Sequence, residues 1–409
     1  MIAICKTIRT AGLRPAFYLL RGRHHISQTC IVAAAAMMFV SAAHGGEMVI
    51  GVAGPMTGPL AAAGKQYAAA VAYSAAQINK SGGLNGQRLR VVTADDRATP
   101  KQALAAARKL VEAKSAIVIG HYNSTPTIAA NEIYRKHDVL LVAPQAIISR
   151  LTDLEAWNVV RLAPRADAQA KVAVDFLATR KPSAGAKPKI AIVHDNSPFP
   201  RLLAEKAESV LKARGIGIAL EGEIPPGSRH TRSIIRRLSD RIATSRVDAI
   251  YWTGSSADAA QFLIALHQRK HAAGFVGTDV LASPVFARSN NPKALAGAYM
   301  TLRSASPANG NIDAMLELSG VKARGEQAAP ALAARAAMQL VVAAARQTGS
   351  NEPRRLARHL RSGKRFQTVL GAMSFNAAGD RQEKLFQIYR WILAEDGKLI
   401  YQREKPGSE

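Results

Sequence analysis

The sequence predicts an α/β fold in which parallel sheets are covered by helices and are divided between two lobes. From Met48 onward, short apolar runs alternate with longer segments of helical period, a pattern typical of parallel strands joined by helices. The pattern occurs as two series of similar length, without a repeat at the level of residues. With 409 residues, 48% of them hydrophobic, the chain is long enough for a sizeable core and more than one domain.

The first series predicts one lobe. Its apolar runs have the length of buried strands, and the segments between them carry apolar residues at helical spacing. The expected strands are 48–53, 89–94, 116–120 and 139–143, and the expected helices are 60–80, 100–113 and 125–136.

The second series predicts a lobe of the same plan. Its expected strands are 189–194, 218–224, 248–253 and 275–280, and its expected helices are 166–180, 200–214, 232–244 and 257–271. The aperiodic segment 181–188 is expected to be a surface loop. After the second series we expect a strand at 299–303 and two or three helices up to about 361. A segment at 367–375 and strands at 385–393 and 398–402 are expected to follow.

The first 45 residues have the composition of a secretory signal peptide. They contain five basic residues and no acidic one, then the apolar run 31–40, then the small residues 41–43. The run is too short for a transmembrane helix, which needs ~20 apolar residues. We expect cleavage after Ala43 or Gly45 and export of the mature chain. Both cysteines, Cys5 and Cys30, precede the folded part, so we expect no disulfide and no Cys-ligated metal.

The chain is strongly basic, with 55 Lys and Arg against 29 Asp and Glu. Removing the five leader charges from the net charge of +26 leaves +21. Such a charge indicates either an anionic partner or a solvated basic surface, and we favour the surface because the charges are dispersed. On a helix, four arginines of the second series would lie opposite four apolar residues, and no aromatic residues interleave with them as single-strand nucleic-acid binding needs. These residues are Arg232, Arg236, Arg237 and Arg241, opposite Ile234, Ile235, Leu238 and Ile242. We expect no nucleic-acid partner.

The motifs of common enzymes are absent from the sequence. Gly64 and Lys65 follow Gly58 at the wrong spacing for a phosphate-binding loop, and Gln66 stands where that loop needs Ser or Thr. There is no HExxH, no GxSxG and no close cluster of His and carboxylates. We therefore expect no enzyme activity, no metal and no cofactor.

Two histidines and a group of small polar residues follow the predicted strands. His121 and His194 lie at the ends of predicted strands. Two roles are open for each: a proton carrier, or a hydrogen bond to the nearby backbone. We favour the hydrogen bond to the backbone. Open α/β sheets bind ligands at the carboxyl ends of their strands, where residues 121–125 and 144–146 lie. Ser124 and Thr125 either cap the next helix or face a ligand carboxylate, and the sequence alone favours capping.

Several motifs in order along the chain resemble the leucine/isoleucine/valine-binding protein family, the type I periplasmic solute-binding proteins of ABC transporters. The motifs are IGVAGPMTGP at 50–59, INKSGGLNG at 78–86 before a strand ending in Asp95 and Asp96, PKQA at 100–103, VIGH at 118–121, IVHD at 192–195 and FNAAGD at 375–380. The resemblance covers nearly the whole chain after the leader.

The resemblance implies two Rossmann-like lobes with parallel sheets, joined by a three-strand hinge. Lobe 1 is then 48–163 plus 300–370, and lobe 2 is 164–299 plus 371–409. It also implies a periplasmic monomer that binds a branched-chain or other hydrophobic amino acid, or a related small carboxylate, and delivers it to a membrane permease. A sensor of the same fold, reporting an amide or small acid to a signalling partner, is the alternative.

The resemblance further implies the residues of the binding site. Ser124 and the groups at Ala146 and Ile147 would hold a ligand carboxylate, and Asp279 would hold its ammonium group. Ile147 replaces a threonine of the family, although Ser149 offers a nearby hydroxyl. Phe199 stands where the family has a tyrosine, and Ser255 or Ser256 stands where it has another. Ala98 and Asn123 stand at the two positions that a disulfide joins in the family. Fewer hydroxyls make the site less suited to a full zwitterion.

Overall fold

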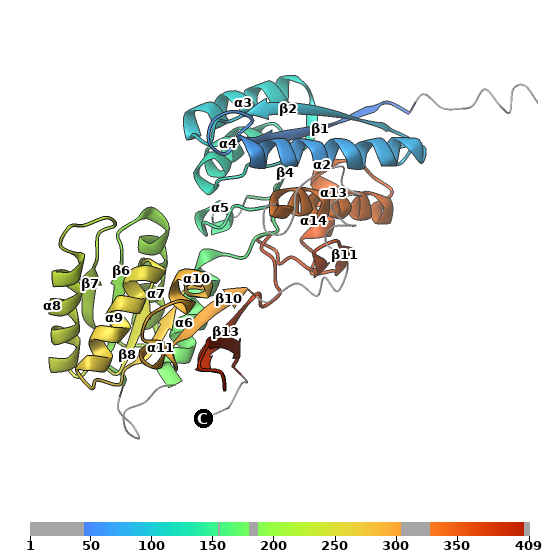
Figure 1. The fold of residues 1–409 in the computed structure, drawn as a ribbon. Helices are drawn as coiled ribbons and strands as arrows, with labels where there is room; N and C mark the ends of the chain where they lie inside the picture. Colours follow the sequence, from blue (N-terminus) through green and yellow to red (C-terminus); the bar gives the residue numbers. More distant parts are fainter. Residues whose placement is uncertain (1–44, 154–155, 180–186, 304–327, 405–409) are drawn as a thin grey trace, which may run out of the picture. The chain divides into compact units, whose positions relative to one another are not determined.

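A computed structural model describes residues 45–153, 156–179, 187–303 and 328–404 (Figure 1). Residues 1–44, which hold almost all of the predicted leader, and most of the predicted loop 181–188 lie outside the described residues. No helix in the described part of the chain has the length and apolar character needed to cross a membrane.

The first sheet consists of five parallel strands in the order β2-β1-β3-β4-β5. Seven of the eight residues of β1 are buried, which explains its almost uninterrupted apolar sequence. The loops after the neighbouring strands β1 and β3 diverge at the carboxyl edge of the sheet, because the first leads to α2 on one face and the second to α4 on the other. The strands are β1 (Glu47–Gly54), β2 (Arg88–Asp95), β3 (Ser115–Ile119), β4 (Leu140–Ala143) and β5 (Val159–Arg161).

Helices cover both faces of this sheet. One face is covered by α2 (Ala61–Lys80), α13 (Ala329–Thr348) and α14 (Pro353–Leu360), and the other by α3 (Pro100–Glu112) and α4 (Ser124–Lys136). Helices α2 and α13 run side by side (Figure 1), and the buried alanines of α13 allow this close approach. The short helix α5 (Arg150–Asp153) and the hairpin of β11 (Phe366–Thr368) and β12 (Gly371–Met373) complete this group of elements.

The second sheet is mixed, with the order β14-β13-β10-β9-β8-β6-β7. Its parallel part contains β6 (Ile190–His194), β7 (Ile218–Glu223), β8 (Ala249–Trp252), β9 (Gly274–Gly277) and β10 (Tyr299–Arg303). Strand β13 (Phe386–Leu393) is antiparallel to β10, and β14 (Leu399–Arg403) is antiparallel to β13. The expected parallel sheet is confirmed for β6 to β10, and the β13–β14 hairpin extends it with antiparallel strands, because only a short turn joins β13 to β14 and a parallel pair needs a long crossover.

Helices also cover both faces of the second sheet. Helices α6 (Ala166–Thr179) and α7 (Pro198–Ala213) share one core, and α8 (Thr231–Thr244) and α9 (Ser256–Gln268) share the other. In α8, Ile235, Leu238 and Ile242 are buried while the four arginines are exposed, which confirms the predicted amphipathic helix. The short elements η1 (Asp279–Ala282), α10 (Pro284–Ala287) and α11 (Pro292–Leu295) lead into β10.

The chain passes between the two groups of elements three times, after β5, after β10 and after β12. The predicted boundary at 300 falls inside β10, which pairs with β9 and β13 in the second sheet. The predicted boundary at 371 falls at β12, which pairs with β11. The return to the second sheet therefore occurs between Met373, which is buried with the elements of the first sheet, and Phe386, where β13 begins.

Two other elements differ from the sequence prediction. Strand β5 was not expected, because its three residues are too few to show a pattern. The strand expected at 275–280 ends at Gly277, where the chain turns into η1 and Leu281 folds back over the glycine. Asp279 consequently lies on a helical turn at the sheet edge rather than on a strand.

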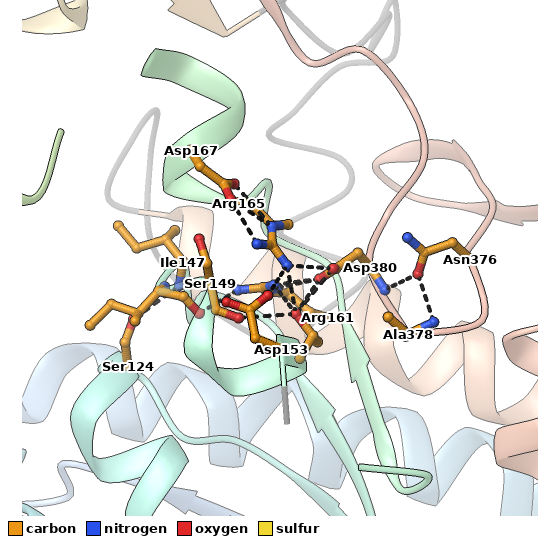
Figure 2. A network of polar contacts seen from close by, with 12 residues as sticks. Ser124, Ile147, Ser149, Asp153, Arg161, Arg165, Asp167, Asn376, Ala378 and Asp380 are labelled. Carbon is orange, nitrogen blue, oxygen red and sulfur yellow. Dashed lines mark hydrogen bonds and ion pairs between the residues drawn. The ribbon is translucent and has the colours of Figure 1, made fainter. Parts of the chain in front are cut away.

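The turn at residues 376–380 extends the first sheet beyond β5. The backbone N–H of Arg161 donates to the carbonyl of Gly379 at 2.8 Å, and Arg161 pairs with Asp380 as a parallel bridge. Asn376 shapes the turn, because its side-chain oxygen accepts from the N–H groups of Ala378 and Asp380 (Figure 2). Gly379 has φ +90°, and a Cβ there would lie 2.0 Å from the carbonyl oxygen of Val159.

Replacing Gly379 with Ala is expected to lower the free energy of unfolding by about 2–4 kcal/mol, since the new methyl group meets backbone in addition to the strained φ. Gly82→Ala is the matched control, because Gly82 has φ +92° with nothing within 4 Å of a Cβ, and strain alone should cost about 1–2 kcal/mol. Urea denaturation measures both variants. Equal losses would contradict the close approach of Gly379 to β5.

Candidate functional site

A hollow of about 810 Å³ lies at the carboxyl edge of the first sheet. The loops after β1, β3, β4 and β5 contribute to its walls, together with the first turns of α2 and α13. This is the edge at which open α/β sheets bind ligands. The lining residues are Pro59, Leu60, Ala62, Ala63, Gln66, Tyr122, Pro144, Gln145, Ile147, Leu162, Ala163, Pro164, Arg303, Ala329, Pro330, Leu332, Ala333, Leu370, Arg381 and Leu385.

Ser124 connects the start of α4 to the loop after β4. Its Oγ accepts from the backbone N–H of Ile147 at 3.0 Å and from that of Ile148 at 3.3 Å (Figure 2). The N-cap of α4 is Asn123, so the capping role that the sequence favoured for Ser124 is wrong. Ala146 is fully buried in the core beneath the loop, whereas Ile147 lines the hollow. The structure thus brings together Ser124 and Ile147 of the predicted carboxylate site.

A buried guanidinium group fixes the same loop from the other side. Arg161, fully buried at the end of β5, donates from Nη1 to the carbonyl of Ile148 at 2.6 Å and from Nε to Asp380 Oδ1 at 2.9 Å. Its Nη2 contacts Asp380 again and also Thr152 Oγ1, which donates to both carboxylate oxygens of Asp380. Burial lowers the pKa of Arg161, and its pairing with Asp380 opposes this effect.

A second arginine joins this network at the start of α6. Arg165 binds Asp167 at 2.7 Å, Asp153 at 2.8 Å and Asp380 at 3.1 Å (Figure 2). These bonds, led by those to Asp167, raise the pKa of Arg165. Burial acts to raise the pKa of Asp167, but its bonds and charge pairing with Arg165 outweigh burial and lower it.

The network attaches the loop beside the hollow to the first passage between the sheets. Arg161 holds the carbonyl of Ile148, and the backbone N–H of Ala166 donates to the carbonyl of Ile147 at 3.0 Å. Residues 161–166 are the segment through which the chain leaves β5 for α6. Arg161 is therefore a positioning residue for the loop that carries Ile147.

Asp279, predicted to hold an ammonium group, is the first residue of η1 and is exposed. Its Oδ1 accepts from Nε2 of Gln169 at 3.0 Å, and the same amide donates to Thr301 Oγ1 at 3.1 Å. Burial, and then the charge of Asp279, raises the pKa of Tyr251 on the neighbouring strand β8. Gln169 thus orients one carboxylate oxygen of Asp279.

The other two predicted residues begin helices of the second sheet. Phe199, in the first turn of α7, is 39% exposed. Ser255 is the N-cap of α9, where its Oγ accepts from the N–H of Asp258 at 3.1 Å and donates to Asp258 Oδ2 at 2.8 Å. The hydroxyl of Ser255 is therefore committed to its helix. Among the described residues that line the hollow of the first sheet, Ile147 belongs to the site that the resemblance implied. Tyr122, Pro144 and Gln145 belong to the strand-end residues that the sequence pattern had indicated.

His121 forms a buried contact that the sequence analysis did not predict. Its Nδ1 lies 2.6 Å from Asp96 Oδ2, and its Nε2 lies 3.1 Å from the hydroxyl of Tyr134. The expected bond to backbone is therefore wrong for His121. It holds for His194, whose Nδ1 accepts from the N–H of Asn196 at 3.1 Å. Asp96 and His121 follow strands that both pair with β1, so their contact depends on the strand order, which the sequence pattern does not give.

Gly64, whose spacing from Gly58 does not fit a phosphate loop, has a packing role. A Cβ on Gly64 would lie 2.3 Å from the carbonyl oxygen of Pro55, so this glycine allows α2 to contact the loop after β1. Within the described residues, no group of three or more His, Cys, Asp or Glu is placed to hold a metal ion.

An open parallel sheet with a hollow at its carboxyl edge, joined by three passages to a second α/β unit, defines the class of two-lobed α/β ligand-binding proteins. The chain belongs to the periplasmic binding protein family, whose model matches residues 47–398. This membership confirms the resemblance found in the sequence motifs.

One curated relative also shows this membership, and two solved structures share the fold. The chain is 32% identical over 372 residues to Leu/Ile/Val-binding protein homolog 2 of Brucella abortus, covering 91% of this chain and 97% of the relative. A substrate-binding protein of Desulfitobacterium hafniense, solved with leucine, has a TM-score of 0.60 and 22% identity, covering 87% of this chain and all of that one. A solute-binding protein of Rhodopseudomonas palustris, solved with 3,4-dihydroxybenzoic acid, has a TM-score of 0.58 and 18% identity, covering 88% and 96%.

Asp380→Ala is expected to lower the free energy of unfolding by about 3–5 kcal/mol, because the buried guanidinium of Arg161 loses its counter-charge. Glu205→Ala is the control, since it breaks the exposed pair of Glu205 and Arg201, which contributes about 0.5 kcal/mol or less. Denaturant titration measures both. A loss for Asp380→Ala as small as the control would contradict the role of the network.

The lowered pKa of Asp167 predicts a contribution to acid sensitivity. Its carboxylate stabilises the fold fully above the unfolded pKa of about 3.9, and this stabilisation is lost as the pH falls through the lower folded pKa. Asp167→Asn should therefore flatten the decline in the free energy of unfolding below about pH 4. Denaturant titrations across the acid range test this, and parallel curves for variant and wild type would oppose it.

Proposed function

We propose that this chain is the substrate-binding component of an ABC transporter, and that it binds a branched-chain or other hydrophobic amino acid or a related small carboxylate. The name of the Brucella relative supports this proposal, as does the leucine in the neighbour from Desulfitobacterium. The aromatic acid in the Rhodopseudomonas neighbour supports the broader class of carboxylates. We further propose that the leader at 1–45 directs the chain to the periplasm.

The arrangement at Ser124 is the observation that carries this proposal. Because the Oγ of Ser124 accepts two backbone N–H groups, its hydroxyl hydrogen is oriented away from the loop. A carboxylate at this position receives that hydrogen together with the N–H groups at the start of α4, whose dipole favours negative charge. Hydrogen bonds to an ionised carboxylate are roughly twice as strong as neutral ones.

The walls of the hollow suit an apolar ligand body. Leu60, Ala63 and Leu332 line it together with Ile147, which supplies a hydrocarbon side chain where the resemblance expects a hydroxyl. Burying a hydrocarbon chain against such walls contributes about 25 cal/mol for each Å² removed from water. The ligand is thus recognised by charge at its carboxylate and by apolar contact along its body.

Asp279 is proposed to bind an ammonium group, if the ligand carries one. Gln169 occupies one carboxylate oxygen of Asp279, which leaves the other for the ligand. Phe199 is proposed to contribute an apolar wall, whereas Ser255 offers only backbone groups because its hydroxyl caps α9.

Domain closure around the ligand would exclude water, strengthen these polar contacts and present the loaded protein to a membrane permease. The protein is proposed to act as a monomer and to perform no chemistry.

Calorimetry with leucine and with 4-methylpentanoate, which lacks the amine, tests the two ends of the site separately. Asp279→Asn should weaken leucine binding at least about tenfold and leave 4-methylpentanoate unchanged, because only leucine needs the counter-charge. Ser124→Ala should weaken both ligands. Asp396→Asn, an equal change of charge on the exposed turn between β13 and β14, is the control.

The pattern of affinities separates the possible outcomes. Wild-type binding of 4-methylpentanoate without leucine would retain the carboxylate site and reject the amine site at Asp279. Equal weakening of both ligands by Asp279→Asn would also reject that role. Binding of neither ligand, nor of any other small carboxylate, would reject the proposed function.

A further inference from the structure

A second concentration of charge lies away from the hollow, on α14 and the segment that follows it. Residues 354–365 contain six cationic side chains and no Asp or Glu. Leu356, Ala357 and Leu360 bury one side of α14 in the core, so the cations project from the opposite side. We name this surface the α14 basic face. Its members are Arg354, Arg355, Arg358, Arg361, Lys364 and Arg365, all exposed except the half-buried Arg361.

Few acidic groups compensate this face. Arg354 pairs with Asp138 at 2.6 Å. Glu352 is occupied at the helix N-cap, where its carboxylate accepts from the N–H groups of Arg354 and Arg355. Within the described residues, the side chains of the other exposed members form no ion pair. The face therefore presents an excess of positive charge to a partner.

The basic face contains a built groove rather than charge alone. The groove has a volume of about 310 Å³. The guanidinium of Arg354 lies over the ring of Trp157, 4.4 Å from its centroid. Arg358 and Arg361 line the same groove, and the floor includes Ala357 and Ala377. An indole and three guanidinium groups thus share one recess.

Arg361 is held in a fixed orientation at this groove. Its Nε donates to the carbonyl of Ala377 at 2.7 Å and its Nη1 to the carbonyl of Ala156 at 2.9 Å. Carbonyl oxygens satisfy these donors without neutralising the charge. Burial lowers the pKa of Arg361, and the nearby charge of Asp380 opposes this only in part. An anion in the groove would complete the compensation.

We propose that the α14 basic face docks on anionic phospholipid, and that the groove beside Trp157 holds the phosphate of one headgroup. Guanidinium groups match phosphate oxygens in geometry as well as in charge. Tryptophan prefers the headgroup level of a bilayer, and clustered Lys and Arg bind anionic lipid surfaces. Phospholipid is chosen over other phosphate sources because of the periplasmic location, so this choice rests on the proposed function. The docking face itself does not involve the solute site.

Sedimentation of the mature chain with vesicles tests this proposal. Binding is expected to vesicles of equal parts phosphatidylglycerol and phosphatidylcholine, and not to phosphatidylcholine alone, and it should weaken steeply with salt. The double variant Arg355→Glu and Arg358→Glu should reduce partitioning about tenfold or more. Both side chains are exposed, so circular dichroism and solute binding should stay at wild-type values.

The double variant Arg236→Glu and Arg237→Glu on α8 is the matched control. It changes the net charge equally, at two exposed arginines of the other sheet, and should leave vesicle binding within about twofold. Equal losses in the two double variants would show a response to net charge only and overturn the proposal. Binding to phosphatidylcholine alone, or to neither vesicle, would overturn it as well.

Fluorescence separates a headgroup in the groove from general adhesion. Trp252 and Trp391 are at most 2% exposed. A change of tryptophan emission on adding vesicles should therefore come from Trp157 and should vanish in Trp157→Phe. Inorganic phosphate is the second probe. If phosphate alone gives the full change and no vesicle binds, the groove takes a soluble anion and the lipid proposal fails. Retention on polyglutamate beads without vesicle binding would instead assign the face to an acidic protein.

Discussion

The buried pair of Arg161 and Asp380 is the interaction on which the first half of the molecule depends. A guanidinium without exposure to water must have a counter-charge and filled hydrogen bonds, since either defect is strongly destabilising. Asp380, Thr152 and the carbonyl of Ile148 meet this need together. The cation consequently determines where the loop after β4 lies, where α6 starts and where the turn at 376–380 docks.

The same pair makes the proposed solute site a product of distant parts of the chain. Ser124 lies at the start of α4, and its loop partners follow β4, but the guanidinium that fixes the loop comes from β5 and its carboxylate from the third passage between the sheets. Because residues 161–166 also form the first passage, a change of angle between the lobes acts directly on the carbonyl groups of that loop. In the proposed function, ligand binding and a rotation between the lobes would therefore share one set of hydrogen bonds.

Local periodicity predicted most of the strands and helices, and it failed where long-range pairing decides the structure. The alternation of apolar runs identified β1 to β4 and β6 to β9 because each run is itself a strand, and all of these strands except the edge strands β2 and β7 are largely buried. It had no means of placing β10 beside β13, since antiparallel pairing with the C-terminal hairpin depends on residues about ninety positions away. Ser124 and Ile147 were expected together and lie together. Arg161 and His121 were missed as structural centres because their partners lie on other strands or turns.

The separation of 219 residues between Arg161 and Asp380 has a consequence for biosynthesis. The sheet formed by β1 to β5 is complete in the N-terminal part of the chain, yet its core also requires α13, α14 and the β11–β12 hairpin. A chain emerging in order from the ribosome cannot bury that core until nearly its whole length has been made. The N-terminal strands thus stay without their final packing during synthesis, which is the state that the proposed export through a secretion channel would require.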